Sequence, residues 1–106
     1  MVEDFMVKEV YDVLILGAGP AGMTAAIYAG RYNMKALVVG KTVGGTANLA
    51  GELENWPGFS GSGMELMQEI RKQAEKFGAK FLEEEVKTVE KDKEKFVLHV
   101  GDKVIH

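Results

Sequence analysis

The chain contains no cysteine, only two prolines and a single tryptophan among its 106 residues. Without cysteine it can form no disulfide, hold no metal through thiolates and carry no cysteine redox chemistry of its own. No apolar run approaches the roughly 20 residues of a membrane-spanning helix, so we expect no membrane partner. Positive charge is not in excess either: the formal net charge of −3 argues against nucleic acid as a partner.

The composition is that of an ordinary globular chain, with 46% hydrophobic and 27% charged residues. Its length suits one small domain with one core. Residues 1–10 are acidic and lack the apolar centre of a signal peptide, so we expect a cytoplasmic protein. We expect these residues to form a short amino-terminal arm, in which Phe5, Met6 and Val10 can pack on the domain.

The most regular pattern of the chain lies between residues 11 and 45. Two short apolar runs, Val13–Leu16 and Ala36–Val39, flank a stretch of small residues that favours a helix ending near Tyr32. Strand, turn, helix and strand follow one another within about thirty residues, which is the span of one βαβ unit. We therefore predict such a unit over residues 11–40.

A glycine-rich turn, Gly17-Ala18-Gly19-Pro20-Ala21-Gly22, separates the first strand from the helix. Gly17 permits a sharp exit from the strand, Gly19 lets a phosphate approach the backbone, and Gly22 lets the helix lie close to the strand. Pro20 suits the first helical position, where no amide hydrogen is missed. A chance glycine turn is the alternative, but the flanking strands and helix favour a dinucleotide site at the helix start.

The acid that binds the ribose in many such sites is absent. At the end of the second strand, where this acid is expected, the chain has Gly40 and Lys41. Residues 41–62 form a long segment that we expect to be ordered, because Leu49, Leu53, Trp56 and Phe59 can pack, with Trp56 as a core anchor. Within it, Gly44-Gly45-Thr46 presents successive backbone amides that could bind an anion or a polar ring edge, or could be a simple turn.

The remainder of the chain predicts a helix, a short strand and an antiparallel meander. Ser62 and Glu65 form a capping box at the start of a helix over residues 62–78, which Gly78 ends. We expect its apolar stripe, which includes Phe77, to be core packing. A strand at residues 79–82 precedes the meander, in which Gly101-Asp102 forms the last turn. We expect the acidic run 83–85 to be solvated.

The order GAGPAG, AAIYAGR, GG, ENWPGF, FGAKF and meander resembles the amino-terminal part of low-molecular-weight thioredoxin reductases, which are class II pyridine nucleotide-disulfide oxidoreductases. The resemblance covers residues 11–106 and implies an α/β, Rossmann-like three-layer fold, part of an FAD/NAD(P)-binding domain. It implies FAD as the cofactor, with a βαβ unit at 11–40, a cofactor loop at 41–62, a helix at 62–78 and a strand and meander at 79–106. The cofactor-binding residues that the resemblance and the glycine pattern select are Gly17, Gly19, Pro20, Ala21, Gly22, Gly40, Lys41, Gly44, Gly45, Thr46 and Asn55.

In the thioredoxin reductase family, electrons pass from NADPH through FAD to a CxxC disulfide. The NADPH domain, the cysteines and the segment that completes the FAD site do not match anything in this chain, so NADP is expected only in that missing part. The resemblance therefore implies a fragment that is catalytically incomplete alone, with no catalytic residue and no metal ligand to assign. The missing neighbour of strand 13–16 would leave an open edge, from which we expect self-association or a complementary chain.

Two other readings stay open. One is a fragment of a ferredoxin–NADP reductase-like flavoprotein, although ENWPGF favours the thioredoxin reductase branch. The other is a non-enzymatic βαβ module that binds a nucleotide or a partner. It is favoured by Gly40 in place of the acid and by Thr46, where the family usually has glutamine.

Overall fold

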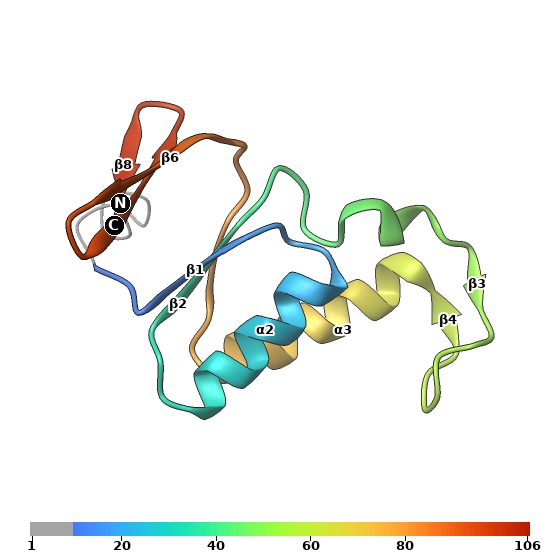
Figure 1. Ribbon diagram of the computed structural model, residues 1–106. Coiled ribbons are helices and arrows are strands. Elements are labelled where there is room, and N and C mark those ends of the chain that lie inside the picture. Colours follow the sequence, from blue (N-terminus) through green and yellow to red (C-terminus); the bar gives the residue numbers. More distant parts are fainter. Residues whose placement is uncertain (1–9) are drawn as a thin grey trace.

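The computed structural model describes residues 10–106, so the expected packing of Phe5 and Met6 lies outside the described residues. Val10 is 53% exposed. The elements follow one another as shown in Figure 1. Those of residues 10–106 are β1 (Val13–Leu16), α2 (Pro20–Arg31), β2 (Ala36–Val39), the 3-10 helix η1 (Gly45–Leu49), β3 (Glu52–Leu53), β4 (Gly61–Ser62), α3 (Gly63–Lys76), β5 (Lys80–Leu82), β6 (Val86–Asp92), β7 (Lys95–Val100) and β8 (Lys103–Ile105).

A parallel sheet forms the middle of the molecule, with the strand order β1-β2-β5. β1 pairs with β2 from Val13↔Ala36 to Leu16↔Val39, and β2 pairs with β5. Every residue of β2 is buried, as expected for the central strand of a parallel sheet covered on both faces. Both strands of the predicted βαβ unit are confirmed with the bounds that their apolar runs indicate.

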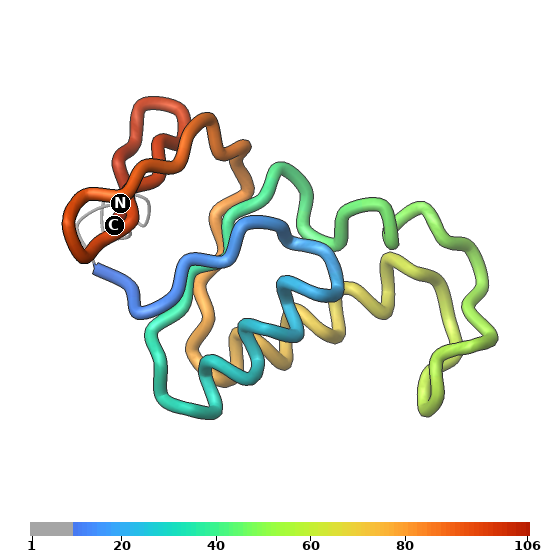
Figure 2. Tube along the Cα trace, in the orientation of Figure 1, coloured from blue at the N-terminus to red at the C-terminus, as the bar shows by residue number. Residues whose placement is uncertain are grey.

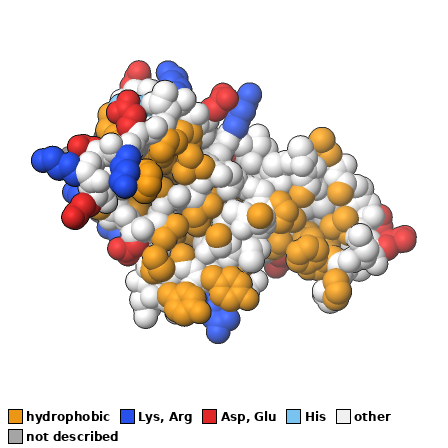
Figure 3. Space-filling view, viewed as in Figure 1, with side chains coloured by type: hydrophobic (Ala, Val, Ile, Leu, Met, Phe, Trp, Pro, Cys, Tyr) orange, Lys and Arg blue, Asp and Glu red, His pale blue; other side chains and the backbone are white. Residues whose placement is uncertain are grey.

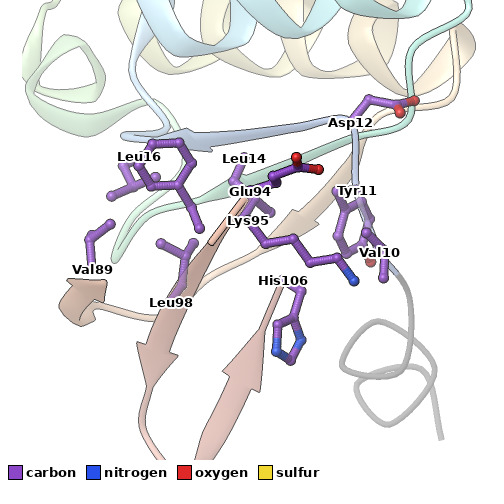
Figure 4. A pocket seen from close by; sticks show the side chains of 11 residues that line it. Val10, Tyr11, Asp12, Leu14, Leu16, Val89, Glu94, Lys95, Leu98 and His106 are labelled. Atoms are coloured by element: carbon purple, nitrogen blue, oxygen red, sulfur yellow. The ribbon is translucent and has the colours of Figure 1, made fainter. Parts of the chain in front are cut away.

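Two further layers cover the sheet, which confirms the three-layer fold. Figure 4 shows the helices on one face and the meander on the other. Alternate residues of β2 divide between two hydrophobic clusters: Val38 packs with the helices, while Leu37 and Val39 pack with Leu98 and Val100 of the meander. This alternation is the period of two that a strand imposes on its side chains.

The two helices lie side by side on the same face of the sheet (Figure 1). On α2, Met23, Ala26 and Ala29 are buried, whereas Ala25 is exposed because it lies on the opposite face of the helix. On α3 the apolar stripe is buried except for Phe77, which is 38% exposed at the C-cap. The Phe77 expectation was wrong because the helix ends there.

The capping box at the start of α3 is confirmed in both directions. The amide of Glu65 donates to the hydroxyl oxygen of Ser62 (3.2 Å), and the amide of Ser62 donates to the Glu65 carboxylate (3.2 Å). At the other end Gly78 adopts φ 101° directly after the C-cap, a left-handed conformation typical of a helix stop.

The segment between β2 and α3 is ordered, as expected, but packs less than expected. It contains η1 and the short antiparallel pair β3–β4, which extends away from the sheet (Figures 1 and 2). Leu53 and Phe59 pack against the helix-side core, whereas Leu49 is 85% and Trp56 is 46% exposed. The prediction of Trp56 as a core anchor was therefore wrong, because the segment carrying it projects beyond the core.

The last three strands form the predicted meander, in the order β6-β7-β8. Positive φ angles at Lys93 and Gly101 mark its two tight turns. The acidic run before it is not simply solvated: the ammonium of Lys103 donates to Glu84 Oε1 at 2.7 Å, and the Glu84 side chain is 30% exposed. Glu84 is drawn inward because β8 comes back beside the β5–β6 connection.

Candidate functional site: a glycine cradle at the start of α2

The candidate site begins where β1 ends. Gly17 leaves the strand with φ 120°, a conformation that side-chain-bearing residues rarely adopt, while its amide still donates to the carbonyl of Val39 (2.8 Å). Gly19 is the N-cap of α2, and Pro20 is its first residue. A Cβ built on Gly19 would meet no atom within 4 Å, so this position opens to the outside.

The backbone of this turn is suited to an anion. The first amides of an α-helix have no acceptor within the helix, and the aligned peptide dipoles place partial positive charge there. The first turn of α2 contains no acidic residue that would oppose an anion. Gly19 brings no side chain between these amides and a ligand, so a phosphate could reach the backbone directly.

Gly22 has a different task in the same motif. A Cβ on Gly22 would lie 1.9 Å from the carbonyl oxygen of Gly17 and 3.3 Å from a methyl group of Ile15. Position 22 must therefore be glycine for α2 to approach the end of β1 this closely. The geometric role expected of the third glycine is present in the structure.

The paired glycines after β2 come to the same place. The amide of Gly44 donates to the carbonyl of Ala18 (2.7 Å), and a Cβ on Gly45 would lie 3.7 Å from the Cα of Gly19. Both paired glycines have positive φ, 98° and 56°. The glycine turn and the paired glycines therefore lie against each other, and we call residues 17–22 and 44–45 together the glycine cradle.

Gly40 also belongs to this neighbourhood. A Cβ on it would lie 2.8 Å from the Cβ of Ala18, so a ribose-binding carboxylate at this position would displace the turn. Lys41 follows with an exposed side chain and lines an open groove of about 410 Å³ beside the Glu84–Lys103 pair. The sequence has glycine instead of the ribose-binding acid at position 40, and the structure shows that Gly40 lies close to the backbone of Ala18.

The remaining candidate residues lie at different depths. Ala21 is exposed in the first turn of α2, and Thr46 is exposed in η1, directly after the cradle. Asn55 is exposed in the loop between β3 and β4, which projects away from the sheet (Figure 1). The structure brings the glycines together but gives Asn55 no contact with them among the hydrogen bonds of residues 10–106.

Two residues that support the loop of the paired glycines, Asn48 and Gly63, were not predicted from the sequence. The side-chain amide of Asn48 donates to the carbonyl of Val43 (2.8 Å) and lies against Gly44, which holds the loop that carries the paired glycines. A Cβ on Gly63 would lie 2.0 Å from the carbonyl oxygen of Ala47, so α3 starts directly against η1. The capping box indicated the start of α3, but no local pattern indicated what the helix start would contact.

Other site types find less support in the part of the chain that the structure describes. Residues 10–106 contain no group of three or more histidine, aspartate or glutamate side chains that could hold a metal ion. None of the described helices is both long and apolar enough to cross a membrane. His99 lies 3.7 Å from a carboxylate oxygen of Glu90 on the meander, away from the cradle.

The parallel sheet, the crossover helix and the glycine turn at its start define a Rossmann-like α/β protein. A family model described as pyridine nucleotide-disulphide oxidoreductase matches residues 11–105, and the chain belongs to this family. The fold class expected from the sequence is confirmed by the observed architecture and by its similarity to solved thioredoxin reductases.

Thioredoxin reductases are prominent among the similar proteins. That of Bacillus subtilis (strain 168) is 41% identical over 98 residues, which cover 91% of this chain and 31% of the relative. That of Treponema pallidum (strain Nichols) is 46% identical over 94 residues, 86% of this chain and 31% of the relative. The solved thioredoxin reductase of T. acidophilum matches with a TM-score of 0.85 at 33% identity and covers 93% of this chain and 33% of that one.

The chain thus spans about a third of the length of the curated relatives it matches. The match lies in their amino-terminal part, which confirms the resemblance to thioredoxin reductases. The ferredoxin–NADP reductase alternative and the non-enzymatic module are not favoured by these comparisons.

Proposed function

We propose that the glycine cradle binds the pyrophosphate of FAD, and that the chain is the FAD-binding part of a thioredoxin-reductase-like flavin oxidoreductase. The residues fit the cofactor: the Cβ position of Gly19 is open, the first amides of α2 face outward from the helix, and Gly45 lies opposite. The single observation that carries the proposal is this meeting of two glycine segments at one helix start.

The division of the chain follows from the same proposal. Residues 11–40 hold the ADP part, with the adenosine extending past Gly40 toward Lys41. The segment 41–62 is the cofactor loop, in which Thr46 and Asn55 face the flavin side. Residues 62–78 and 79–106 support this arrangement from the helix layer and the meander layer, respectively.

When bound, FAD supplies the hydride and electron chemistry of the reaction. The residues of this chain bind and orient it through backbone amides, and none of them acts as acid, base or nucleophile. In the complete reaction we propose, NADPH is the donor and a disulfide the acceptor. Because the chain has no cysteine, the disulfide must come from elsewhere.

Two matched glycine substitutions test the cradle. Gly19 and Gly51 both have an open Cβ position and neither has a positive φ, so Gly19→Val and Gly51→Val are both compatible with folding. We expect Gly19→Val alone to block the approach of a phosphate and to weaken binding of ADP and FAD by about tenfold or more. Calorimetric titration with each ligand, together with absorbance from 300 to 550 nm after gel filtration, measures this loss.

The outcomes separate the candidate functions. Retained flavin absorbance in the native protein and its loss in Gly19→Val support the FAD-binding function. Binding of ADP but not of FAD, with the same sensitivity, would identify a nucleotide-binding module instead. Equal binding by both variants, or no binding by the native protein, would reject the cradle as the site.

We also propose that the free edge of β1 pairs with a second chain, either another copy or a complementary one. Within residues 10–106, β1 has a strand neighbour on one side only, and Leu16 is 48% exposed. A groove of about 330 Å³ runs between this edge and the meander, where Leu14, Leu98 and His106 face it (Figure 4). An apolar groove beside an unpaired strand favours strand addition.

The charge-introducing change Leu16→Lys tests this pairing, since the side chain is already exposed. We expect sedimentation velocity to show that the native protein associates and that the Leu16→Lys variant associates less. A protein that remains monomeric at tens of micromolar, with no complementary chain retained on it, would reject the edge as an interface.

A further inference from the structure

The glycine cradle carries no charged side chain. Residues 17–22 and 42–50 contain no lysine, arginine, aspartate or glutamate. Figure 3 shows the same distribution on one face of the molecule: charged side chains gather over the meander, and few lie around the start of α2 and η1. An anion at the cradle therefore depends on backbone amides, whose directions are set by the local backbone conformation.

The paired glycines need a restraint from outside to keep one conformation. Glycine loses more backbone freedom on ordering than any other residue, and here Gly44 and Gly45 follow one another. Both have positive φ angles, which glycine adopts readily but is not bound to keep. A segment that becomes ordered only when the ligand binds gives a weaker affinity than one that is already in place.

The peptide between Val43 and Gly44 is held on both of its sides. Its N–H donates to the carbonyl of Ala18 in the glycine turn (2.7 Å), and its carbonyl accepts from the side-chain amide of Asn48 (2.8 Å). A Cβ built on Gly44 would collide with the Asn48 carboxamide, so this side chain packs directly on the glycine. The peptide is thereby fixed relative to the start of α2.

Asn48 approaches the paired glycines from the side of α3. Its partly buried side chain lines a groove of about 220 Å³ that Met67 and Gln68 of α3 also line. Gly45, by contrast, comes close to Gly19 at the start of α2. The carboxamide therefore supports the glycine segment from the side opposite to the one where we place the ligand.

We propose that Asn48 is a positioning residue of the cofactor site, whose carboxamide holds the Val43–Gly44 peptide and with it the paired glycines in the conformation that binds the phosphate-bearing cofactor. This inference rests on the proposed function of the cradle. A side chain at position 48 that cannot donate leaves the Val43 carbonyl without this partner and releases the peptide on one side.

Loss of the Asn48 amide should leave the fold intact, because η1 is attached to α3 by other contacts. The amide of Gly63 donates to the carbonyls of Ala50 (3.0 Å) and Gly51 (3.2 Å). Asn48→Leu nearly keeps the size of the side chain but removes the donor. Gln68→Leu is the matched control, since Gln68 is an exposed amide residue on the same groove.

Amide hydrogen exchange of the unliganded full chain measures the restraint directly. We expect the Gly44 amide to exchange about tenfold faster in Asn48→Leu than in the native protein or in Gln68→Leu. Amides in the middle of α2 and α3 should exchange at the native rate in all three proteins. An unchanged Gly44 rate would overturn the proposal.

Calorimetric titration with FAD and with ADP measures the consequence for binding. Asn48→Leu should weaken both by about fivefold or more, whereas Gln68→Leu should bind like the native protein. Asn48→Asp adds a test in pH. Its carboxylate cannot donate at neutral pH, but the protonated acid can at about pH 4, so its affinity relative to the native protein at the same pH should rise as the pH falls.

The outcomes distinguish this role from the proposed function. Binding that Gly19→Val abolishes and Asn48→Leu leaves unchanged would overturn the role of Asn48 and keep the cradle as the site. No binding by the native protein would reject both. Equal losses in Asn48→Leu and Gln68→Leu, or a loss in Asn48→Asp alone, would also overturn the role, because groove packing or charge would then explain the effect.

Discussion

Gly19 and Gly22 lie three residues apart in one motif, yet they are required for opposite reasons. At Gly19 the absent side chain leaves space for a ligand, and at Gly22 it leaves space for the carbonyl oxygen of Gly17. The first requirement concerns binding and the second concerns folding. Substitutions at the two positions should therefore separate in a stability measurement.

Gly22→Ala should destabilise the fold by about 3 kcal/mol, because the new Cβ meets backbone atoms that cannot move without separating α2 from β1. Urea unfolding followed by circular dichroism measures the change. Gly51→Ala is the control, with open space around its Cβ, and should stay close to the native protein. If Gly22→Ala were as stable as the control, the close approach of helix and strand would not be a constraint.

At the scale of the elements, the start of α3 is capped by two side chains, Ser62 and Glu65. The Ser62 hydroxyl accepts from the amide of Glu65, and the Glu65 carboxylate accepts in return. Ser62→Ala should therefore cost about 1 kcal/mol of unfolding free energy. Ser60→Ala, two residues earlier and exposed, should cost almost nothing. Equal effects in chemical denaturation would mean that the cap contributes no stability.

The elements that the sequence predicts well are those specified by local patterns. The apolar runs predict β1 and β2 to the residue, and the Ser62–Glu65 spacing predicts the start of α3. The meander follows from alternation and turn residues. In each case the information lies within a few neighbouring residues.

Expectations failed where the outcome depends on distant parts of the chain. Trp56 is as hydrophobic as a core anchor, but its exposure is set by the projection of the β3–β4 segment beyond the helices. The candidate site likewise has one part that a local pattern predicts and another part that depends on contacts between distant segments. The glycine turn was recognisable from its own spacing, whereas the contacts of Gly45 with Gly19 and of Gly63 with Ala47 connect residues that are 26 and 16 positions apart in the sequence.

At the scale of the whole molecule, the meander layer must stay attached to the parallel sheet where β5 ends. The meander is joined to β5 by residues 83–85, and the ion pair between Glu84 and Lys103 connects this junction to β8. Both side chains are largely shielded, with 30% and 21% exposed, and Glu84 Oε2 is buried with no hydrogen-bond partner. A Cβ built on Gly101 would lie 3.6 Å from this oxygen.

Glu84→Ala should lower the unfolding free energy by about 1 to 2 kcal/mol, between the values for exposed and fully buried ion pairs. The change leaves the Lys103 ammonium in a shielded place without this carboxylate, so the loss should exceed that from an exposed pair. Glu69→Ala removes the partner of Lys72 in a pair that is 63% and 72% exposed, and should change stability by less than about 0.5 kcal/mol.

Urea denaturation monitored by far-ultraviolet circular dichroism compares the two glutamate variants with the native protein. Because shielded pairs are screened less by salt than exposed ones, the Glu84→Ala difference should persist at about 0.5 M salt. Amide hydrogen exchange should locate the effect in β8 and residues 83–85, since the pair connects these two segments. A Glu84→Ala protein as stable as Glu69→Ala, with unchanged exchange in β8, would show that apolar packing alone attaches the meander to the sheet.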